Sequence, residues 1–151
     1  NSVRPCLAIA PDGRLSIGFP ESVPPGADVL QAGPLLLRDG VAWADYSDWQ
    51  SKAKEFDSDI TARRFPRSAL GLSAEHLFLL AVDGRCPESA GLYLQECADL
   101  LRELGATEAL NLDGGGSSAL VVAGRLCNNP RTWDNQPDPA ERPVPTAIVL
   151  T

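Results

Sequence analysis

Hydrophobic positions in the first third of the chain occur in short runs separated by turn signals. Runs at residues 6–10 and 15–19 flank a Pro-Asp-Gly turn, and runs at residues 31–38 and 41–43 flank an Asp-Gly turn. Short apolar runs interrupted by Asp-Gly are typical of β-hairpins, because the glycine accepts the positive φ of a tight turn. The pattern therefore predicts two strand-turn-strand units.

The middle of the chain changes from polar to strongly apolar. Residues 45–64 lack a sustained apolar face and predict a surface excursion, with a short helix at residues 49–56. Residues 68–72 and 77–82 then predict two adjacent strands. The second run, LFLLAV, has no polar position, so we expect that strand to be buried on both faces.

Helical periodicity begins at Leu94 and ends near Leu104. Five positions share one stripe, Glu96 lies in the first turn and Gly105 is placed to end the helix; the stripe is Leu94, Cys97, Ala98, Leu101 and Leu104. Three further strands are predicted at residues 110–112, 119–124 and 146–150. The expected class is α+β, mostly β strands in a mixed sheet with one helix at about residues 94–104.

Composition favours one domain over residues 1–151, since 44% of the residues are hydrophobic. The formal net charge of -7 argues against a nucleic-acid partner, which would require clustered Lys and Arg. No run approaches 18 apolar residues, so no membrane span is expected. The four cysteines lack a C-x-x-C pair, which disfavours structural zinc; two disulfides and buried free thiols both stay open.

The stretch NLDGGGSS at residues 111–118 is the main candidate for chemistry. Three glycines let the backbone approach a ligand and direct N–H groups at one anion, and the two serines add hydroxyl donors. The pattern matches neither a Walker loop nor a dinucleotide fingerprint. The alternative is a wide hairpin turn.

Polar side chains also follow or precede the other predicted strands. Asp83 and Arg85 follow the apolar run at residues 77–82, and Asp113 follows residues 110–112. If those two strands are neighbours, Asp83 and Asp113 face one another and can divide acid and base roles. Otherwise each carboxylate caps a turn.

Two arginines precede predicted strands and can offer planar donors to phosphate. Arg67 precedes residues 68–72 and Arg142 precedes residues 146–150. Surface salt bridges are the alternative. His76, the only histidine, is interpreted as an ordinary surface residue.

Five stretches follow one another along the chain: QAGPLLLRDG, RFPRSALGL, LFLLAVDGR, GLYLQECADLLRELGATEALNLDGGGSSALVV and ERPVPTAIVL. Together they resemble the phosphodiester glycosidase family over residues 31–151. The resemblance implies hydrolysis of the glycosidic bond of a sugar-1-phosphodiester, with a small or polymeric sugar phosphate as partner. It implies no cofactor, and a divalent cation stays open. It also implies that the chain lacks an N-terminal strand usual in the family, so that one wall of the site is either missing or supplied by another chain. The location stays open, with a secreted or extracytoplasmic protein favoured.

Carried over position by position, the resemblance implies the following site. The catalytic residues are Asp83 and Asp113, and the substrate-binding residues are Arg67, Arg85, Asn111, Gly114, Gly115, Gly116, Ser117 and Arg142. Two other hypotheses stay open: a noncatalytic module that binds sugar-phosphate polymers of cell walls or capsules, and a phosphoesterase that breaks P–O bonds, which would usually need a metal.

Overall fold

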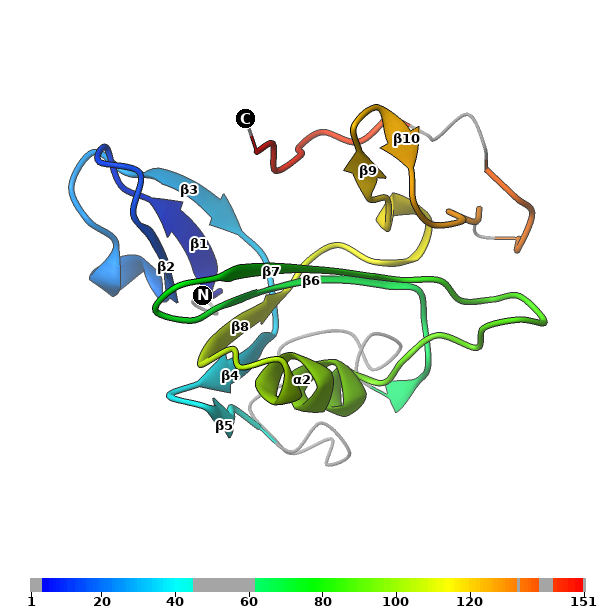
Figure 1. Cartoon of the computed structure of the whole chain (residues 1–151), viewed down its shortest axis with the longest axis horizontal. Helices are drawn as coiled ribbons and strands as arrows, with labels where there is room; N and C mark the ends of the chain where they lie inside the picture. The colour runs from blue at the N-terminus through cyan, green and yellow to red at the C-terminus, as the bar shows by residue number, and fades with distance from the viewer. Residues whose placement is uncertain (1–3, 45–61, 133, 139–142, 151) are drawn as a thin grey trace.

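The computed structural model describes residues 4–44, 62–132, 134–138 and 143–150 (Figure 1). The expected short helix at residues 49–56 lies outside them, as does most of the polar stretch. In chain order the strands and the helix are β1 (Cys6–Ile9), β2 (Leu15–Gly18), β3 (Asp28–Gln31), β4 (Leu35–Arg38), β5 (Val41–Ala42), β6 (Arg67–Leu72), β7 (Leu77–Val82), α2 (Leu94–Glu103), β8 (Glu108–Asn111), β9 (Val121–Val122) and β10 (Arg125–Leu126). Single 3-10 turns lie at Pro20–Ser22 and Gly115–Ser117.

The expected class, mostly strands with one helix, is confirmed. The main sheet has the order β5-β4-β8-β6-β7, and a smaller sheet has the order β2-β1-β3. We expected a mixed sheet, but every strand pair in the described residues is antiparallel. In the main sheet, successive strands are joined by tight turns, or the chain comes back to lie beside an earlier strand and runs in the opposite direction.

Two cores cover the two faces of the main sheet. Ala69 and Ala109 pack against α2, whereas the adjacent Leu70 and Leu110 pack with Leu7 of the small sheet. This division follows from the alternation of side chains along a strand. Figure 1 accordingly shows α2 and the β1–β3 sheet on different sides of β8 and β6.

Both predicted strand-turn-strand units are present. β1 pairs with β2, and β4 pairs with β5 across Asp39 and Gly40, which both have positive φ. The prediction of one strand over residues 31–38 is wrong. The chain leaves the small sheet after β3, passes a cis Gly33-Pro34 peptide and starts β4 in the main sheet. Pro34 has no N–H to donate to a strand neighbour, which explains the break.

β6 and β7 are adjacent, as predicted, but the expected burial of β7 on both faces is wrong. β7 lies at the edge of the sheet and Leu79 is 38% exposed. Within the main sheet the buried strands are β4, β6 and β8. An apolar run alone does not distinguish an edge strand from a central one, because that depends on the partners.

The helix is confirmed with one exception in its buried stripe. Leu94, Cys97, Ala98 and Leu101 are buried, but Leu104 is 55% exposed because α2 has ended before it. The chain then turns at Gly105, whose φ is +99°. At the other end the Tyr93 N–H donates to the Glu96 carboxylate at 2.8 Å, which satisfies one of the free N–H groups of the helix start.

The C-terminal predictions are only partly met. β9 and β10 form a hairpin of two-residue strands, shorter than the expected strand at residues 119–124. The expected strand at residues 146–150 is wrong, because these residues pair with no strand in the described structure. Ile148 packs against the core, whereas Val149 and Leu150 are exposed. Within the described residues, no helix is long and apolar enough to cross a membrane.

Candidate functional site

The two aspartates of the predicted site emerge at the same end of the main sheet. β7 and β8 are both antiparallel to β6, so they run in the same direction. Asp83 directly follows β7, and Asp113 lies two residues after the end of β8. These two strands, whose adjacency the sequence left open, are not neighbours, since β6 lies between them. The loops that carry the carboxylates therefore meet across the start of β6.

Two glycines allow these loops to approach the chain that enters β6. A Cβ on Gly84 would lie 2.7 Å from the nitrogen of Pro66, and a Cβ on Gly114 would lie 2.9 Å from its carbonyl oxygen. The Gly115 N–H donates to the same carbonyl at 3.0 Å. Because side chains at Gly84 and Gly114 would collide with backbone, glycine is required for this close packing.

Arg85 connects the two loops. Its guanidinium carbon lies 5.0 Å from the centre of the Phe65 ring, and a Cβ on Gly115 would lie 3.6 Å from Nη1. The half-buried guanidinium makes no hydrogen bond or ion pair with any other residue that the structure describes. A guanidinium fixed by a ring, with its N–H donors unused beside a glycine turn, is suited to bind an anion.

The carboxylates have different surroundings. Asp83 accepts three hydrogen bonds: from the Asn129 N–H at 2.7 Å and Asn128 Nδ2 at 3.2 Å to Oδ1, and from Asn129 Nδ2 at 3.1 Å to Oδ2. Asp113 is exposed, and its Oδ1 accepts from the Gly114 N–H at 3.0 Å. Asp83 is thus held in one orientation, and Asp113 is open to solvent.

Sequence reasoning missed Asn128 and Asn129. Both follow β10, as Asp83 follows β7, so polar residues after a strand were again the available signal. That signal was weak because β10 has only two residues.

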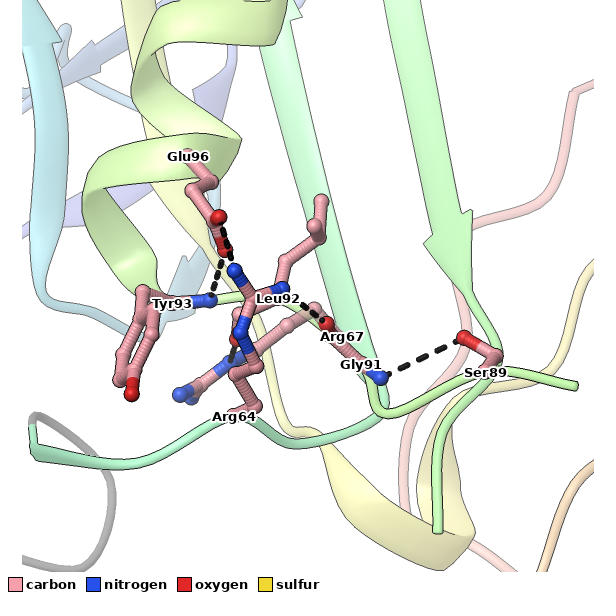
Figure 2. Close-up of polar contacts among 7 residues, drawn as sticks. All are labelled: Arg64, Arg67, Ser89, Gly91, Leu92, Tyr93 and Glu96. Atoms are coloured by element: carbon pink, nitrogen blue, oxygen red, sulfur yellow. Dashed lines mark hydrogen bonds and ion pairs between the residues drawn. The ribbon is translucent and has the colours of Figure 1, made fainter. Parts of the chain in front are cut away.

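Arg67 and Asn111 lie on the α2 side of the sheet, inside the protein. Arg67 is 2% exposed, and it donates from Nε to the Leu92 carbonyl at 3.0 Å and from Nη2 to the Arg63 carbonyl at 2.8 Å. Burial lowers the pKa of Arg67. Figure 2 shows this arginine at the start of α2, near the contact of Arg64 with Glu96.

Asn111 is 3% exposed and fixes the turn between the two sheets. Its Nδ2 donates to the Gly33 carbonyl at 3.0 Å and to the Leu112 carbonyl at 2.9 Å. Its Oδ1 is buried and accepts no hydrogen bond from the described residues. A buried oxygen without a donor is unusual and marks a place for a water or ligand hydroxyl.

The remaining predicted residues form or adjoin the glycine turn. The 3-10 turn Gly115–Ser117 is closed by the Ser117 N–H, which donates to the Gly114 carbonyl at 3.1 Å, and Gly116 is its middle residue. The structure therefore brings together Asp83, Arg85, Asp113 and this turn, with Arg67 and Asn111 on nearby strands. Arg142 lies outside the described residues.

Metal ligands and disulfides were left open by the sequence. In the part of the chain that the structure describes, no group of three or more His, Cys, Asp or Glu side chains is arranged to hold a metal ion. Cys6, Cys86, Cys97 and Cys127 carry free thiols. Burial raises the pKa of Cys97 to about 11.

Comparison with known proteins gives a consistent result. The model of the phosphodiester glycosidase family matches residues 2–151. The mouse N-acetylglucosamine-1-phosphodiester alpha-N-acetylglucosaminidase is 33% identical over 139 residues, which cover 82% of this chain and 26% of that protein.

Two solved structures share the fold. The zebrafish catalytic domain of the same named enzyme, auto-inhibited by its pro-peptide, has a TM-score of 0.68 and 26% identity over 97% of this chain and 50% of that one. A Burkholderia pseudomallei protein described as exported has a TM-score of 0.55 and 28% identity over 82% of this chain and 28% of that one. The chain thus spans half or less of each of these relatives.

Proposed function

The chain belongs to the phosphodiester glycosidase family, and from this membership we propose that it hydrolyses the glycosidic bond of a sugar-1-phosphodiester, releasing the sugar and a phosphomonoester. The observation that carries the proposal is Arg85, whose guanidinium lies between the Phe65 ring and the glycine turn and has no hydrogen-bond or ion-pair partner among the described residues. The names of the mouse and zebrafish relatives support N-acetylglucosamine as the sugar.

The phosphate is assigned to Arg85 and the turn. A planar guanidinium can donate two parallel N–H bonds to phosphate oxygens, and a turn of small residues lets the phosphate come close to backbone N–H groups. The N–H groups of Gly114, Gly115 and Ser117 already donate to Asp113 Oδ1, the Pro66 carbonyl and the Gly114 carbonyl, so the turn is assigned to the phosphate through the Gly116 N–H and the Ser117 hydroxyl. Arg67, Asn111 and Arg142 complete the proposed binding set.

The bond-breaking step is assigned to the carboxylates. Either water attacks the anomeric carbon and gives its proton to Asp113, or Asp113 attacks and water then hydrolyses the covalent glycosyl intermediate. In both cases the bond from that carbon to the phosphate oxygen breaks and its electron pair leaves with the phosphate. A phosphodiester is already a good leaving group, so Arg85 and the Gly116 N–H are assigned to stabilise the developing charge without strong acid assistance. Asp113 is assigned to the reacting carbon because its carboxylate is open, and Asp83 is the second carboxylate of the pair.

The test is sugar release from UDP-N-acetylglucosamine and from N-acetylglucosamine-1-phosphate esters. Wild-type protein should release sugar, whereas Asp113→Asn and Asp83→Asn should each lower kcat by on the order of a hundredfold or more. Asp99→Asn is the control, because Asp99 lies on α2 and pairs with Arg102 at 2.7 Å. Retained release in both site variants would contradict the proposal.

Labelled water separates this chemistry from phosphoesterase chemistry. Cleavage of the C–O bond places the label in the sugar, whereas cleavage of the P–O bond places it in the phosphate. Label in the phosphate would therefore contradict the proposed reaction and identify the protein as a phosphoesterase.

A noncatalytic module for sugar-phosphate polymers is the second candidate. The hydrogen bonds from Asn128 and Asn129 to both oxygens of Asp83 favour it, because they leave Asp113 as the one open carboxylate of the pair. Binding of polymer without any release of sugar would support this candidate. We also infer an extracytoplasmic location, which the exported Burkholderia protein supports.

A further inference from the structure

The side chain of Asn128 makes three hydrogen bonds to two other segments of the site, residues 118–120 and the loop of Asp83. Its Oδ1 accepts from the Leu120 N–H at 2.8 Å, and its Nδ2 donates to the Ser118 carbonyl at 2.7 Å and to Asp83 Oδ1 at 3.2 Å. Both N–H groups and the oxygen of the amide are thus used, on a half-buried residue.

Each partner of Asn128 lies close to the predicted chemistry. Ser118 directly follows the turn Gly115–Ser117 and is fully buried. The Cys127 N–H donates to the Leu120 carbonyl at 2.8 Å, so the Asn128 amide continues the β9–β10 pairing towards the turn. The third bond reaches Asp83, on the loop that also carries Arg85.

We propose that Asn128 is a positioning residue of the active site, which fixes the glycine turn at a set distance from the loop of Asp83 and Arg85. The proposal rests on the proposed function, because it concerns the same phosphate and carboxylate groups. Misplacement of such groups by about 1 Å can lower a rate on the order of a hundredfold. In this assignment Asn128 acts through Asp83 and the turn and contacts neither the sugar nor the phosphate.

Asparagine is required by the pattern of donors and acceptors. Asn128→Asp keeps the shape and the acceptor for Leu120, but it presents a second carboxylate to Asp83 and an acceptor to the Ser118 carbonyl. Asp83 is the charged side chain in contact with Asn128 among the described residues. At low pH a proton on either carboxyl restores a donor between them.

The experiment measures kcat and KM for UDP-N-acetylglucosamine from about pH 5 to pH 8. Asn128→Asp should lower kcat at neutral pH by on the order of a hundredfold and recover activity, relative to wild type, as the pH falls. The control Asn135→Asp introduces the same charge at an exposed position and should follow the wild-type profile. Wild-type kcat with a flat pH profile in Asn128→Asp would overturn the proposal.

A second readout does not depend on turnover. The measured quantity is the rate of amide hydrogen exchange at residues 114–120, divided by the wild-type rate at the same pH. In Asn128→Asp this ratio should exceed one at neutral pH and approach one at low pH. If the wild type releases no sugar, the proposed function fails, and this ratio alone decides the positioning role. An exchange ratio of one at every pH overturns it.

Discussion

Arg85 combines a strained backbone with a guanidinium that makes no hydrogen bond or ion pair in the part of the chain that the structure describes. Its φ of +58° lies in the left-handed region, which disfavours a residue with a Cβ by roughly 1–2 kcal/mol. The ring of Phe65 and the open side of Gly115 hold the guanidinium in place. Strain of this kind is concentrated at ligand sites, so the local geometry supports the anion-binding role.

Replacing Arg85 by lysine tests whether the planar group matters or only its charge. Arg85→Lys keeps the charge but loses the paired donors and the stacking on Phe65, so the KM for UDP-N-acetylglucosamine should rise about tenfold or more. Arg125→Lys, at an exposed position of the β9–β10 hairpin, is the matched control and should leave KM unchanged. Equal KM values in wild type and Arg85→Lys would remove Arg85 from the site.

Because of Cys97, we expect the free energy of unfolding to decrease at alkaline pH. Burial raises its pKa from 9.0 to about 11, so the folded protein keeps the thiol neutral after the unfolded chain has lost the proton. Its contribution is complete below about pH 9 and is lost as the pH rises towards 11, and two pKa steps correspond to about 3 kcal/mol. The free energy of unfolding, measured with urea between these pH values, should show this decrease.

Cys97→Ala is the control for that prediction. It should flatten most of the alkaline decline, with a smaller decline remaining because burial also raises the pKa of Cys6. An unchanged decline in Cys97→Ala would assign the effect to another group.

At the level of elements, the start of β6 and the start of α2 are joined through Gly91. Phe65 and Leu92 pair in an isolated antiparallel bridge, and the Phe65 carbonyl occupies the place where a Cβ on Gly91 would lie. Arg64 reinforces this junction by donating to the Gly91 carbonyl at 3.0 Å and pairing with Glu96, as Figure 2 shows. The contact sets where Phe65, and with it Arg85, can lie.

Substitution of two glycines separates close packing from backbone conformation. Gly91→Ala should lower the free energy of unfolding by roughly 2 kcal/mol or more, because positive φ and backbone overlap act together. Gly40→Ala has a similar φ of +75° but open space, so about 1 kcal/mol is expected. Equal losses by thermal unfolding would show that the junction can shift to accept a side chain.

The elements that the sequence predicted well are those with local signals. The α2 stripe and the turn at Asp39 and Gly40 depend on neighbours in the chain, and both are present. The position of β7 and the break between β3 and β4 depend on which strand lies beside which. Such pairing joins residues distant in sequence, and an apolar run does not encode it.

The same division holds for the site. Asp83, Asp113 and the glycines stand out locally because polar residues end apolar runs. That Asn128 holds Asp83 could not be predicted, since it joins residues 45 positions apart after strands of unequal length.

The whole molecule is organised around two strands shared by both cores. Leu70 of β6 and Leu110 of β8 are fully buried against the small sheet, and their neighbours Ala69 and Ala109 face α2. Loss of packing on one face therefore reaches the backbone that supports the other. We expect the two sheets and the helix to unfold together.

Leu70→Ala tests this coupling. The cavity should lower the free energy of unfolding by about 2–5 kcal/mol, with tryptophan fluorescence and far-UV circular dichroism changing together. Val149→Ala, at a side chain that is 75% exposed, should stay within about 0.5 kcal/mol of wild type. Separate transitions for the two probes would show that the two faces unfold independently.

The single histidine lies at the far end of the sheet from the proposed chemistry. His76 is exposed in the turn before β7, and Asp83 follows the sixth residue of that strand, so about 20 Å of extended chain separates them. An imidazole-directed linker would consequently attach the protein to a surface in one orientation, with Arg85 and Asp113 facing the solution.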